Sequence, residues 1–292
     1  MDSRRIAWAF PGLALVFGAL LGHAPAGAAV AARQAVETTK VAEGVYTFRH
    51  VNHRNMFVVT PEGVIATDPI SPKAASAMMA EIRKVTDKPV KYVIYSHEHW
   101  DHIDGGKVFK DSGAQFISQE KCLETFLPNP NPTVVKPDVT FKDRYDVKLG
   151  GTTLELHYFG PNHGRCSIFM RLPKEKLLFI VDLVTPSRVG FRGMTTTDPG
   201  GAVKSLRALE KLEFDRIIPG HGPASAPAEV VREMREYYED LIAAVREAMK
   251  KTGDVEKIAQ MVKLPKYEKW GMYEKWLPLN VERIVGWLRV GQ

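Results

Sequence analysis

Cysteine is scarce in this sequence: its 292 residues include only two, Cys122 and Cys166. Two cysteines cannot form the disulfide framework that holds small secreted domains together, so the fold must depend on a hydrophobic core. Cys166 lies in an apolar run, which favours buried free thiols over a disulfide. An oxidising compartment would nevertheless allow the two to pair.

Runs of positive charge are also missing, although the formal net charge is +6. Acidic and basic side chains are mixed along the whole chain, and no RNA- or DNA-reading motif accompanies the basic excess. The pattern indicates a solvated basic surface and no nucleic-acid partner. With 45% hydrophobic and 25% charged residues, the composition is that of a globular protein that can bury a core.

A long apolar run occurs only near the N-terminus. Two arginines (Arg4 and Arg5) precede the mostly apolar residues 6–21, and residues 26–28 have the small-x-small form that signal peptidases accept. The run is shorter than the roughly 20 residues that span a bilayer. We therefore expect a cleaved signal peptide over residues 1–28, and a periplasmic or secreted protein with no membrane attachment after cleavage.

Short strands and helices follow one another through the rest of the chain. Strands are expected at residues 45–51, 56–60, 64–67, 90–95, 114–118, 145–148, 152–159, 166–171, 177–181 and 215–218. The main helices are expected at residues 71–86, 201–211, 228–251, 254–262 and 280–289. This order predicts an α/β fold of two sheets with helices outside: a catalytic domain at residues 29–226 and a helical extension, residues 227–292, packed on it.

Metal-binding residue types are concentrated directly after the apolar strand at residues 90–95. His97, His99, Asp101 and His102 lie within six positions there. Imidazole nitrogen and carboxylate oxygen are ligands that zinc takes readily, and a catalytic zinc site keeps one position open for water. One such cluster can supply the ligands of one metal ion and some of the ligands of a second.

Three further candidate ligands each follow a predicted strand. His163 lies in a Gly-Pro-Asn-His-Gly segment, Asp182 ends an apolar run, and His221 lies in Pro-Gly-His-Gly. Glycine beside a histidine lets the backbone bend closely around an ion. Ligands at the ends of separate strands are typical of a rigid catalytic site.

The order of these motifs over about residues 36–223 resembles the metallo-β-lactamase superfamily. The resemblance implies an αββα sandwich, a C-terminal helical extension in this chain, and two Zn2+ ions per chain, with iron or manganese as other possibilities. It assigns His97, His99 and His163 to one ion and Asp101, His102 and His221 to the other, with Asp182 bridging both. Asp68 matches an acidic position near the site, where it would hold a histidine tautomer.

The activity that this resemblance implies is hydrolysis of an acyl bond in a small-molecule substrate by a metal-bound hydroxide. Asp101 is the expected catalytic residue, orienting the water while acting as a ligand. The substrate would be a lactone, ester, thioester or β-lactam. True β-lactamases of the superfamily have Cys or Ser where Asp182 stands, and many lactonases have Tyr where Thr185 stands, so neither narrower assignment matches fully.

Two other functions remain open. One is a persulfide dioxygenase with a single iron, and the other is an accessory role in a periplasmic quinoprotein oxidation pathway. His50 and His53 are candidates for substrate binding in the first hairpin, and Arg188 and Arg192 for binding a substrate carboxylate. The oligomeric state is not encoded in any motif that the sequence contains.

Overall fold

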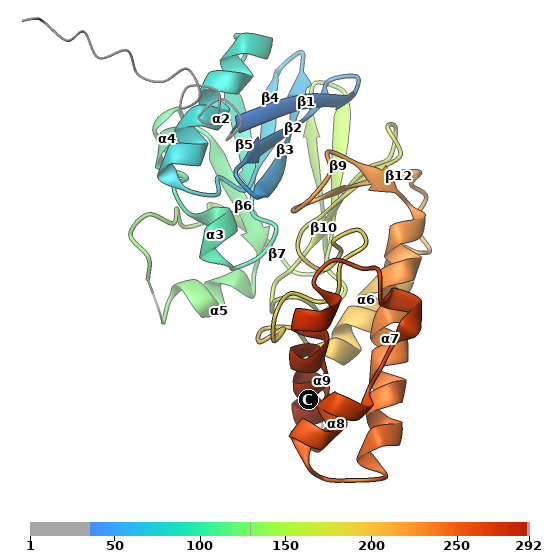
Figure 1. The fold of residues 1–292 in the computed structure, drawn as a ribbon. Coiled ribbons are helices and arrows are strands. Elements are labelled where there is room, and N and C mark those ends of the chain that lie inside the picture. The colour runs from blue at the N-terminus through green and yellow to red at the C-terminus, as the bar shows by residue number, and fades with distance from the viewer. Residues whose placement is uncertain (1–35, 129, 291–292) are drawn as a thin grey trace, which may run out of the picture. The chain divides into compact units, whose positions relative to one another are not determined.

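The computed structural model describes residues 36–128 and 130–290, which belong to one compact unit, Ala35–Gln292. The unit contains two β-sheets with helices on their outer faces (Figure 1). The expected signal peptide, residues 1–28, lies outside the described residues. Within the described residues, no helix has both the length and the apolar composition that crossing a membrane requires.

The first sheet has seven strands that neighbour one another in chain order. They are β1 (Val36–Ala42), β2 (Val45–His50), β3 (His53–Thr60), β4 (Gly63–Thr67), β5 (Val90–Ile94), β6 (Gln115–Gln119) and β7 (Val139–Phe141). Strands β1 to β4 pair antiparallel, and β4 to β7 pair parallel. Parallel neighbours need crossover connections. These contain α2 (Pro72–Val85), α3 (Trp100–Ile103), α4 (Lys107–Asp111) and α5 (Cys122–Phe126).

The second sheet has six strands in the order β13-β12-β11-β10-β9-β8. They are β8 (Arg144–Leu149), β9 (Thr152–His157), β10 (Phe169–Leu172), β11 (Leu177–Ile180), β12 (Arg216–Pro219) and β13 (Ala226–Pro227). Only β11 and β12 pair parallel, and α6 (Pro199–Leu209) lies in the connection between them. The chain continues with α7 (Glu229–Met249), α8 (Val255–Met261), η1 (Pro265–Tyr267) and α9 (Tyr273–Val290).

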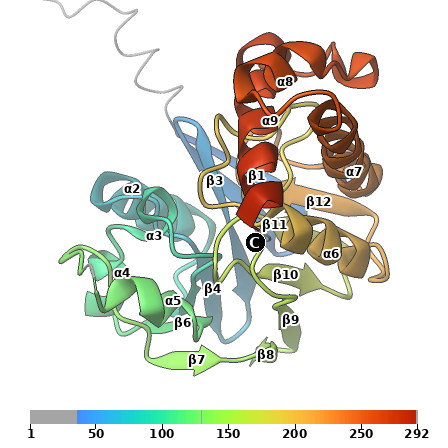
Figure 2. The same cartoon turned by 90° about the horizontal axis from the view of Figure 1, so that it is seen from below.

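Alternating side chains fill three apolar layers, which confirms the αββα sandwich. In β11, Leu177 and Phe179 face the core between the sheets, whereas Leu178 and Ile180 face the core under α6, α7 and α9. In β3, Phe57 packs toward α2. A sheet buried on both faces requires strands that are apolar at successive positions. Figure 2 shows the sheets between α2 to α5 on one side and α6, α7 and α9 on the other.

Helix α9 begins at Tyr273, seven residues before the expected start at residue 280, and includes Pro278. Proline is unfavourable inside a helix because it lacks the N–H that bonds to the preceding turn. Here Pro278 lies near the N-terminal end of α9, and the buried side chains of Leu277 before it and Val281 after it pack into the core. Tertiary packing therefore overrides the local preference.

The expectation of free thiols was wrong: Cys122 and Cys166 form a disulfide with Cα atoms 5.2 Å apart. Both cysteines are completely buried, so the apolar surroundings of Cys166 do not distinguish a thiol from a disulfide. Cys122 begins α5 and Cys166 lies just before β10, and the fold brings these distant segments together.

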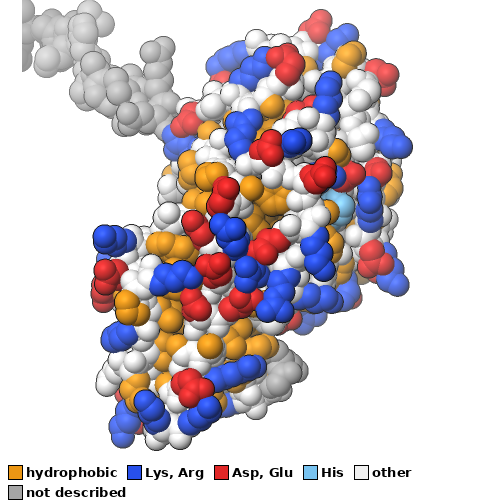
Figure 3. All heavy atoms as spheres, turned by 90° about the vertical axis from the view of Figure 1, so that its right-hand side faces the viewer, with side chains coloured by type: hydrophobic (Ala, Val, Ile, Leu, Met, Phe, Trp, Pro, Cys, Tyr) orange, Lys and Arg blue, Asp and Glu red, His pale blue; other side chains and the backbone are white. Residues whose placement is uncertain are grey.

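The surface shown in Figure 3 carries interspersed basic and acidic side chains, with smaller apolar areas between them. On α7, for example, Arg235 pairs with Glu210 and Glu239. The basic excess of the sequence is thus not gathered into a single patch on this face.

Candidate metal centre

The loop after β5 holds His97 rigidly in the interior. Ser96 Oγ lies 2.8 Å from His97 Nδ1, and the Ser96 backbone N–H donates to Asp68 Oδ1 at 2.8 Å. Asp68 was expected to hold a histidine tautomer; it acts instead on the backbone beside His97, and burial raises its pKa to about 6. With Nδ1 engaged, His97 Nε2 is buried and has no hydrogen-bond partner among the described residues.

His99, Asp101 and His102 follow at the start of the next helix. His99 is the residue before α3, while Asp101 and His102 lie within it. His102 is completely buried, whereas the Asp101 side chain is 60% exposed. Two adjacent residues of this short helix therefore differ: His102 lies in the interior, whereas Asp101 faces the cavity.

The loop that carries His163 is fixed by its own polar groups and by Glu98. Asn162 Oδ1 accepts from the His163 backbone N–H at 2.7 Å. Glu98 accepts from the backbone N–H groups of Arg165 and Cys166, at 2.5 and 3.2 Å. A Cβ at Gly164 would lie 2.7 Å from the Glu98 carboxylate, so any other residue there would have to displace that carboxylate from its hydrogen bonds.

Asp182 lies at the centre of the cluster. It follows β11 with φ of +62°, a left-handed conformation that a non-glycine residue rarely adopts. Its Oδ1 is 2.8 Å from His221 Nε2, and its Oδ2 is 3.2 Å from His102 Nε2. Backbone strain of this kind is concentrated at functional sites, where surrounding structure maintains it.

His221 is oriented by the first hairpin, far away in sequence. Its Nδ1–H donates to the Asn52 carbonyl at 2.6 Å, which leaves Nε2 as the free lone pair. Arg54 fixes the same loop: its backbone N–H donates to Gly220 O at 2.7 Å and its guanidinium to Gly222 O at 3.1 Å. An outer partner that fixes the tautomer is typical of metal-binding histidines.

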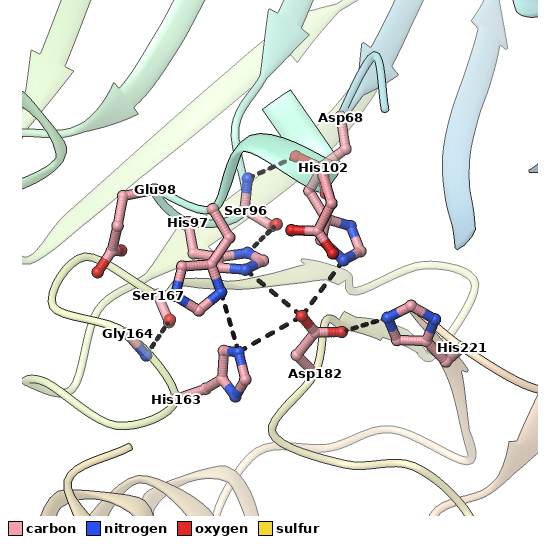
Figure 4. A network of polar contacts seen from close by, with 12 residues as sticks. Asp68, Ser96, His97, Glu98, His102, His163, Gly164, Ser167, Asp182 and His221 are labelled. Atoms are coloured by element: carbon pink, nitrogen blue, oxygen red, sulfur yellow. Dashed lines mark hydrogen bonds and ion pairs between the residues drawn. The ribbon is translucent and has the colours of Figure 1, made fainter. Parts of the chain in front are cut away.

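Four groups meet with the spacing of ligands around one ion. His99 Nδ1 is 3.2 Å from His163 Nε2, and Asp182 Oδ2 is 3.4 Å from His163 Nε2 and 3.5 Å from His97 Nε2 (Figure 4). Zinc–nitrogen bonds of 2.0–2.1 Å in a tetrahedron would place neighbouring ligand atoms about 3.4 Å apart. The four side chains therefore fit a single divalent cation.

A second group consists of His53, His102 and His221, whose ligand atoms all lie within 4.8 Å of one another. Six of the seven predicted ligands thus fall into these two groups, and His53, which the sequence had suggested only for substrate binding, belongs to the second. Asp101 Oδ2 lies 3.1 Å from His53 Nε2, although Asp101 belongs to neither close group. No spacing motif links His53 to the other histidines, so only its place in the first hairpin pointed to this region.

The sequence profile of the metallo-β-lactamase superfamily matches residues 51–221, more than half of the chain. The chain belongs to the metallo-β-lactamase superfamily. Members are mostly hydrolases and usually bind divalent metals, in agreement with the two groups of side chains described above.

Curated relatives within the superfamily are distant. The chain is 24% identical over 261 residues to a linear primary-alkylsulfatase of Pseudomonas sp. (strain ATCC 19151), matching 71% of this chain and 49% of that one. It is 28% identical over 193 residues to the 2,4-dinitroanisole O-demethylase subunit alpha of Nocardioides sp. (strain JS1661), matching 63% and 57%. The chain thus spans about half the length of the curated relatives that it matches.

Solved structures support the superfamily fold. A metallo-β-lactamase from Pontibacter korlensis superposes with a TM-score of 0.63 at 21% identity, over 70% of this chain and 99% of that one. A double mutant of the sec-alkyl sulfatase PisA1 superposes with a TM-score of 0.73 at 18% identity, over 89% of this chain and 52% of that one.

Burial sets two histidines of this superfamily site in the neutral form that metal binding requires, whereas the neighbouring carboxylate favours the charged form of a third. Burial lowers the pKa of His97 to about 4 and that of His163 to about 3, so both are neutral near pH 7. Burial opposes charge on His102, but the Asp182 carboxylate outweighs it and raises the pKa of His102 to about 9. Burial would raise the pKa of Asp182, yet His102 and its neighbours hold it well below its ordinary value.

A third group, Glu98 with Cys122 and Cys166, also has metal-ligand spacing. It is not a metal site, because both sulfurs are joined in the disulfide and cannot act as thiolates. The Glu98 carboxylate already accepts hydrogen bonds from the His163 loop. This group therefore supports the metal centre without adding ligands to it.

The metal-ligand groups open into a cavity of about 1090 Å³. Its lining includes His53, Asp101 and Asp182, residues of the segment 183–197, and side chains from α7 and α9. A cavity of this size accommodates a small organic molecule. The two C-terminal helices thus contribute directly to the site.

Proposed function

We propose that the chain is a hydrolase that cleaves an acyl bond with the help of two divalent cations. The cations are proposed to be zinc ions, with Asp182 as a ligand to both. The main support for the proposal is that Asp182 contacts both groups of histidines. Its Oδ2 lies 3.4 Å from His163 Nε2 in the first group, and its Oδ1 lies 2.8 Å from His221 Nε2 in the second. When bound, a pair of such ions activates a water molecule and polarises a carbonyl oxygen.

The protein contributes position and proton transfer. Asp182 and the buried histidines would hold the ions between the ends of several strands, while Asn52 fixes the tautomer of His221 and Ser96 orients the ring of His97. Asp101 is exposed toward the cavity and is held by His53 at 3.1 Å, so it is placed to orient water and accept its proton. Such positioning of a general base accelerates reactions by about 100-fold or more.

Esters, lactones, thioesters and β-lactams are the first candidate substrates, because each presents an acyl carbon to water. A sulfate ester is the second candidate. It is favoured by the similarity to the linear primary-alkylsulfatase, together with the guanidinium of Arg188 in the same cavity.

The test is a set of initial rates of the zinc-loaded protein on a chromogenic cephalosporin, several lactones, a glutathione thioester, a phosphodiester and an alkyl sulfate. Asp101→Ala is assayed beside it, with His157→Gln as a control, because His157 bonds to Glu155 in β9 away from the metal groups. We expect turnover of acyl substrates that Asp101→Ala abolishes and His157→Gln retains. Turnover that survives in Asp101→Ala would reject the catalytic role.

Metal analysis of the purified protein separates the remaining alternatives. Two zinc ions per chain support the proposal, whereas a single iron with persulfide oxidation would favour the dioxygenase. Absence of turnover on every substrate in the presence of bound zinc would contradict the hydrolase and direct attention to a partner-dependent role.

The proposed location is the periplasm or the cell exterior, and the proposed partner is a small molecule and not a nucleic acid or membrane. The disulfide between Cys122 and Cys166 supports export, because disulfides persist mainly in oxidising compartments. Fractionation of cells that express the full chain, with detection of the processed protein, tests this location.

A further inference from the structure

One part of the cavity lining comes from the segment 183–197 and from the helices that hold it. We call this part the substrate wall; it includes Arg188, Phe191, Met194, Tyr238 and Trp276. Its side chains are mostly apolar or aromatic, and its charged groups are the guanidinium groups of Arg188 and Arg192, whereas the metal groups consist of imidazoles and carboxylates.

Arg188 is held in a fixed orientation within this wall. Its Nη2 donates to Thr185 Oγ1 at 2.9 Å. Its guanidinium carbon lies 5.5 Å from the ring centre of Trp276 and 5.9 Å from that of Phe191. Cation–π contacts of this kind stabilise a cation that has lost part of its hydration. The group is therefore oriented before any ligand arrives.

No carboxylate of the described residues forms an ion pair with Arg188, and its buried Nε–H has no hydrogen-bond partner among them. The acidic side chains that line the cavity are otherwise engaged. Glu37 pairs with Arg49, Asp101 contacts His53, and Asp182 contacts the histidines. A partly buried guanidinium without a counter-ion is costly, so a ligand anion would stabilise it.

The electrostatic environment of Arg188 is consistent with a charged guanidinium that has lost part of its hydration. Burial lowers the pKa of its guanidinium from the ordinary value, and Asp182 opposes that change. Arginine nevertheless remains charged, because its ordinary pKa is so high. The cavity therefore presents a positive charge on the substrate wall as well as the sites for cations on the metal side.

The backbone that carries Arg188 is anchored to the C-terminal segment. Gly271 N–H donates to the Ser187 carbonyl at 2.8 Å, and Val189 N–H donates to the Gly271 carbonyl at 3.4 Å. Asn280, which is completely buried on α9, donates to the carbonyls of Gly190 and Arg192 at 3.0 and 2.5 Å. The position of the guanidinium is thus determined by folded structure on both sides.

We propose that the substrate is an amphiphilic organic anion, whose carboxylate or sulfate binds Arg188 and whose apolar part lies against Phe191 and Trp276. The inference names the substrate class of the proposed hydrolase and rests on that function. Guanidinium groups bind both anions through paired N–H groups. A carboxylate beside a scissile acyl bond and the sulfate of a sulfate ester are the two sources of this chemistry.

The test measures binding without turnover. Calorimetric titration of the zinc-loaded protein uses hexane-1-sulfonate, hexanoate and hexan-1-ol, which share an apolar chain and differ in charge. The variants are Arg188→Gln and Arg232→Gln. Arg232 is an exposed arginine on α7 that does not line the cavity, so it is a control for loss of one positive charge.

Arg188→Gln is expected to weaken binding of both anions by about tenfold or more, the range for hydrogen bonds to charged groups. Binding of hexan-1-ol should change less than about twofold, and Arg232→Gln should change all three by less than about threefold because exposed charges are screened. The proposal would be overturned if both variants weakened anion binding equally, or if Arg188→Gln weakened binding of hexan-1-ol as much as binding of the anions.

Rates then separate this inference from the proposed function. Selective anion binding without any hydrolysis would contradict the hydrolase but keep the anion site. Hydrolysis with equal kcat/KM for anionic and neutral esters would keep the hydrolase and overturn the anion site. Between the two sources, turnover of hexyl sulfate identifies a sulfate ester, whereas turnover of a carboxylate-bearing ester or lactone identifies an acyl substrate.

Discussion

The two sides of the cavity are built in different ways. The metal side uses short loops at the ends of β5, β11 and β12 and the loop before β10, and polar groups fix His97, His163 and His221 in three of them. The substrate wall uses the long segment 183–197, which has no regular structure over most of its length and is held from outside by α7 and α9. Two of the three fixing groups on the metal side are sequence neighbours of their ligand, whereas the substrate wall is held by distant helices.

This difference indicates which amino-acid substitutions each side of the cavity can tolerate. A loop fixed by its own side chains can keep its chemistry while the rest of the cavity changes. A segment fixed by distant helices can change shape when those helices change. The first arrangement suits a reaction centre, and the second suits selection among substrates.

The largest effect is expected from Asp182→Asn on the metal side. The variant keeps the shape of the side chain but loses the negative charge that both histidine groups contact. We expect the loss of at least one ion per chain and a fall in kcat of more than about 100-fold, since even outer partners of ligands contribute 10–100-fold. Inductively coupled plasma mass spectrometry and initial rates measure this; two retained ions would show that Asp182 does not bridge them.

Most of the metal side could be predicted from the sequence because its signals are local. His97, His99 and His102 follow a buried strand within six residues, and His163 and His221 each lie beside glycine. The αββα layers could be predicted too, because strands that are buried on both faces have continuous apolar runs. The metal ligands and the core are thus both encoded in short segments.

The second-largest effect is expected from a substitution of Asn280, which anchors the substrate wall. Asn280→Leu keeps the volume but leaves the carbonyls of Gly190 and Arg192 without their donor and Tyr237 without its acceptor at 2.6 Å. Unpaired buried groups cost about 1–3 kcal/mol each, so thermal stability should fall. We expect KM to rise about tenfold while metal content stays unchanged.

The control for Asn280→Leu is Tyr237→Phe, which removes one hydroxyl and leaves both carbonyls bonded. It should raise KM less than Asn280→Leu does. If Asn280→Leu instead lowers metal content as strongly as it raises KM, the two sides of the cavity are not mechanically separate.

The substrate wall could not be predicted in the same way, because its partners are far apart in sequence. Nothing local connects Arg188 with Gly271 or Asn280 with Gly190. The early start of α9, the disulfide and the place of His53 share this property. Each depends on contacts between segments that only the folded chain brings together.

A smaller effect is expected at His53, which lies on the metal side beside Asp101. His53→Ala removes a member of the second group and the contact that holds Asp101. We expect the affinity of the more weakly bound ion to fall about tenfold, measured by chelator competition, with the other ion unaffected. His50→Ala in the same hairpin is the control. Unchanged affinity for both ions would limit His53 to substrate binding.

The smallest effect on turnover is expected from removing the disulfide with the double variant Cys122→Ala and Cys166→Ala. The bridge closes a separation of 44 residues, so its loss should lower the free energy of unfolding by about 2–4 kcal/mol. Well below the melting temperature, kcat/KM should change by less than threefold, because Glu98 still holds the His163 loop through the backbone of Arg165. Urea unfolding and initial rates together separate the two effects. A loss of turnover comparable to that of Asp182→Asn would show that the metal side also depends on a distant constraint, and the contrast between the two sides would then be one of degree.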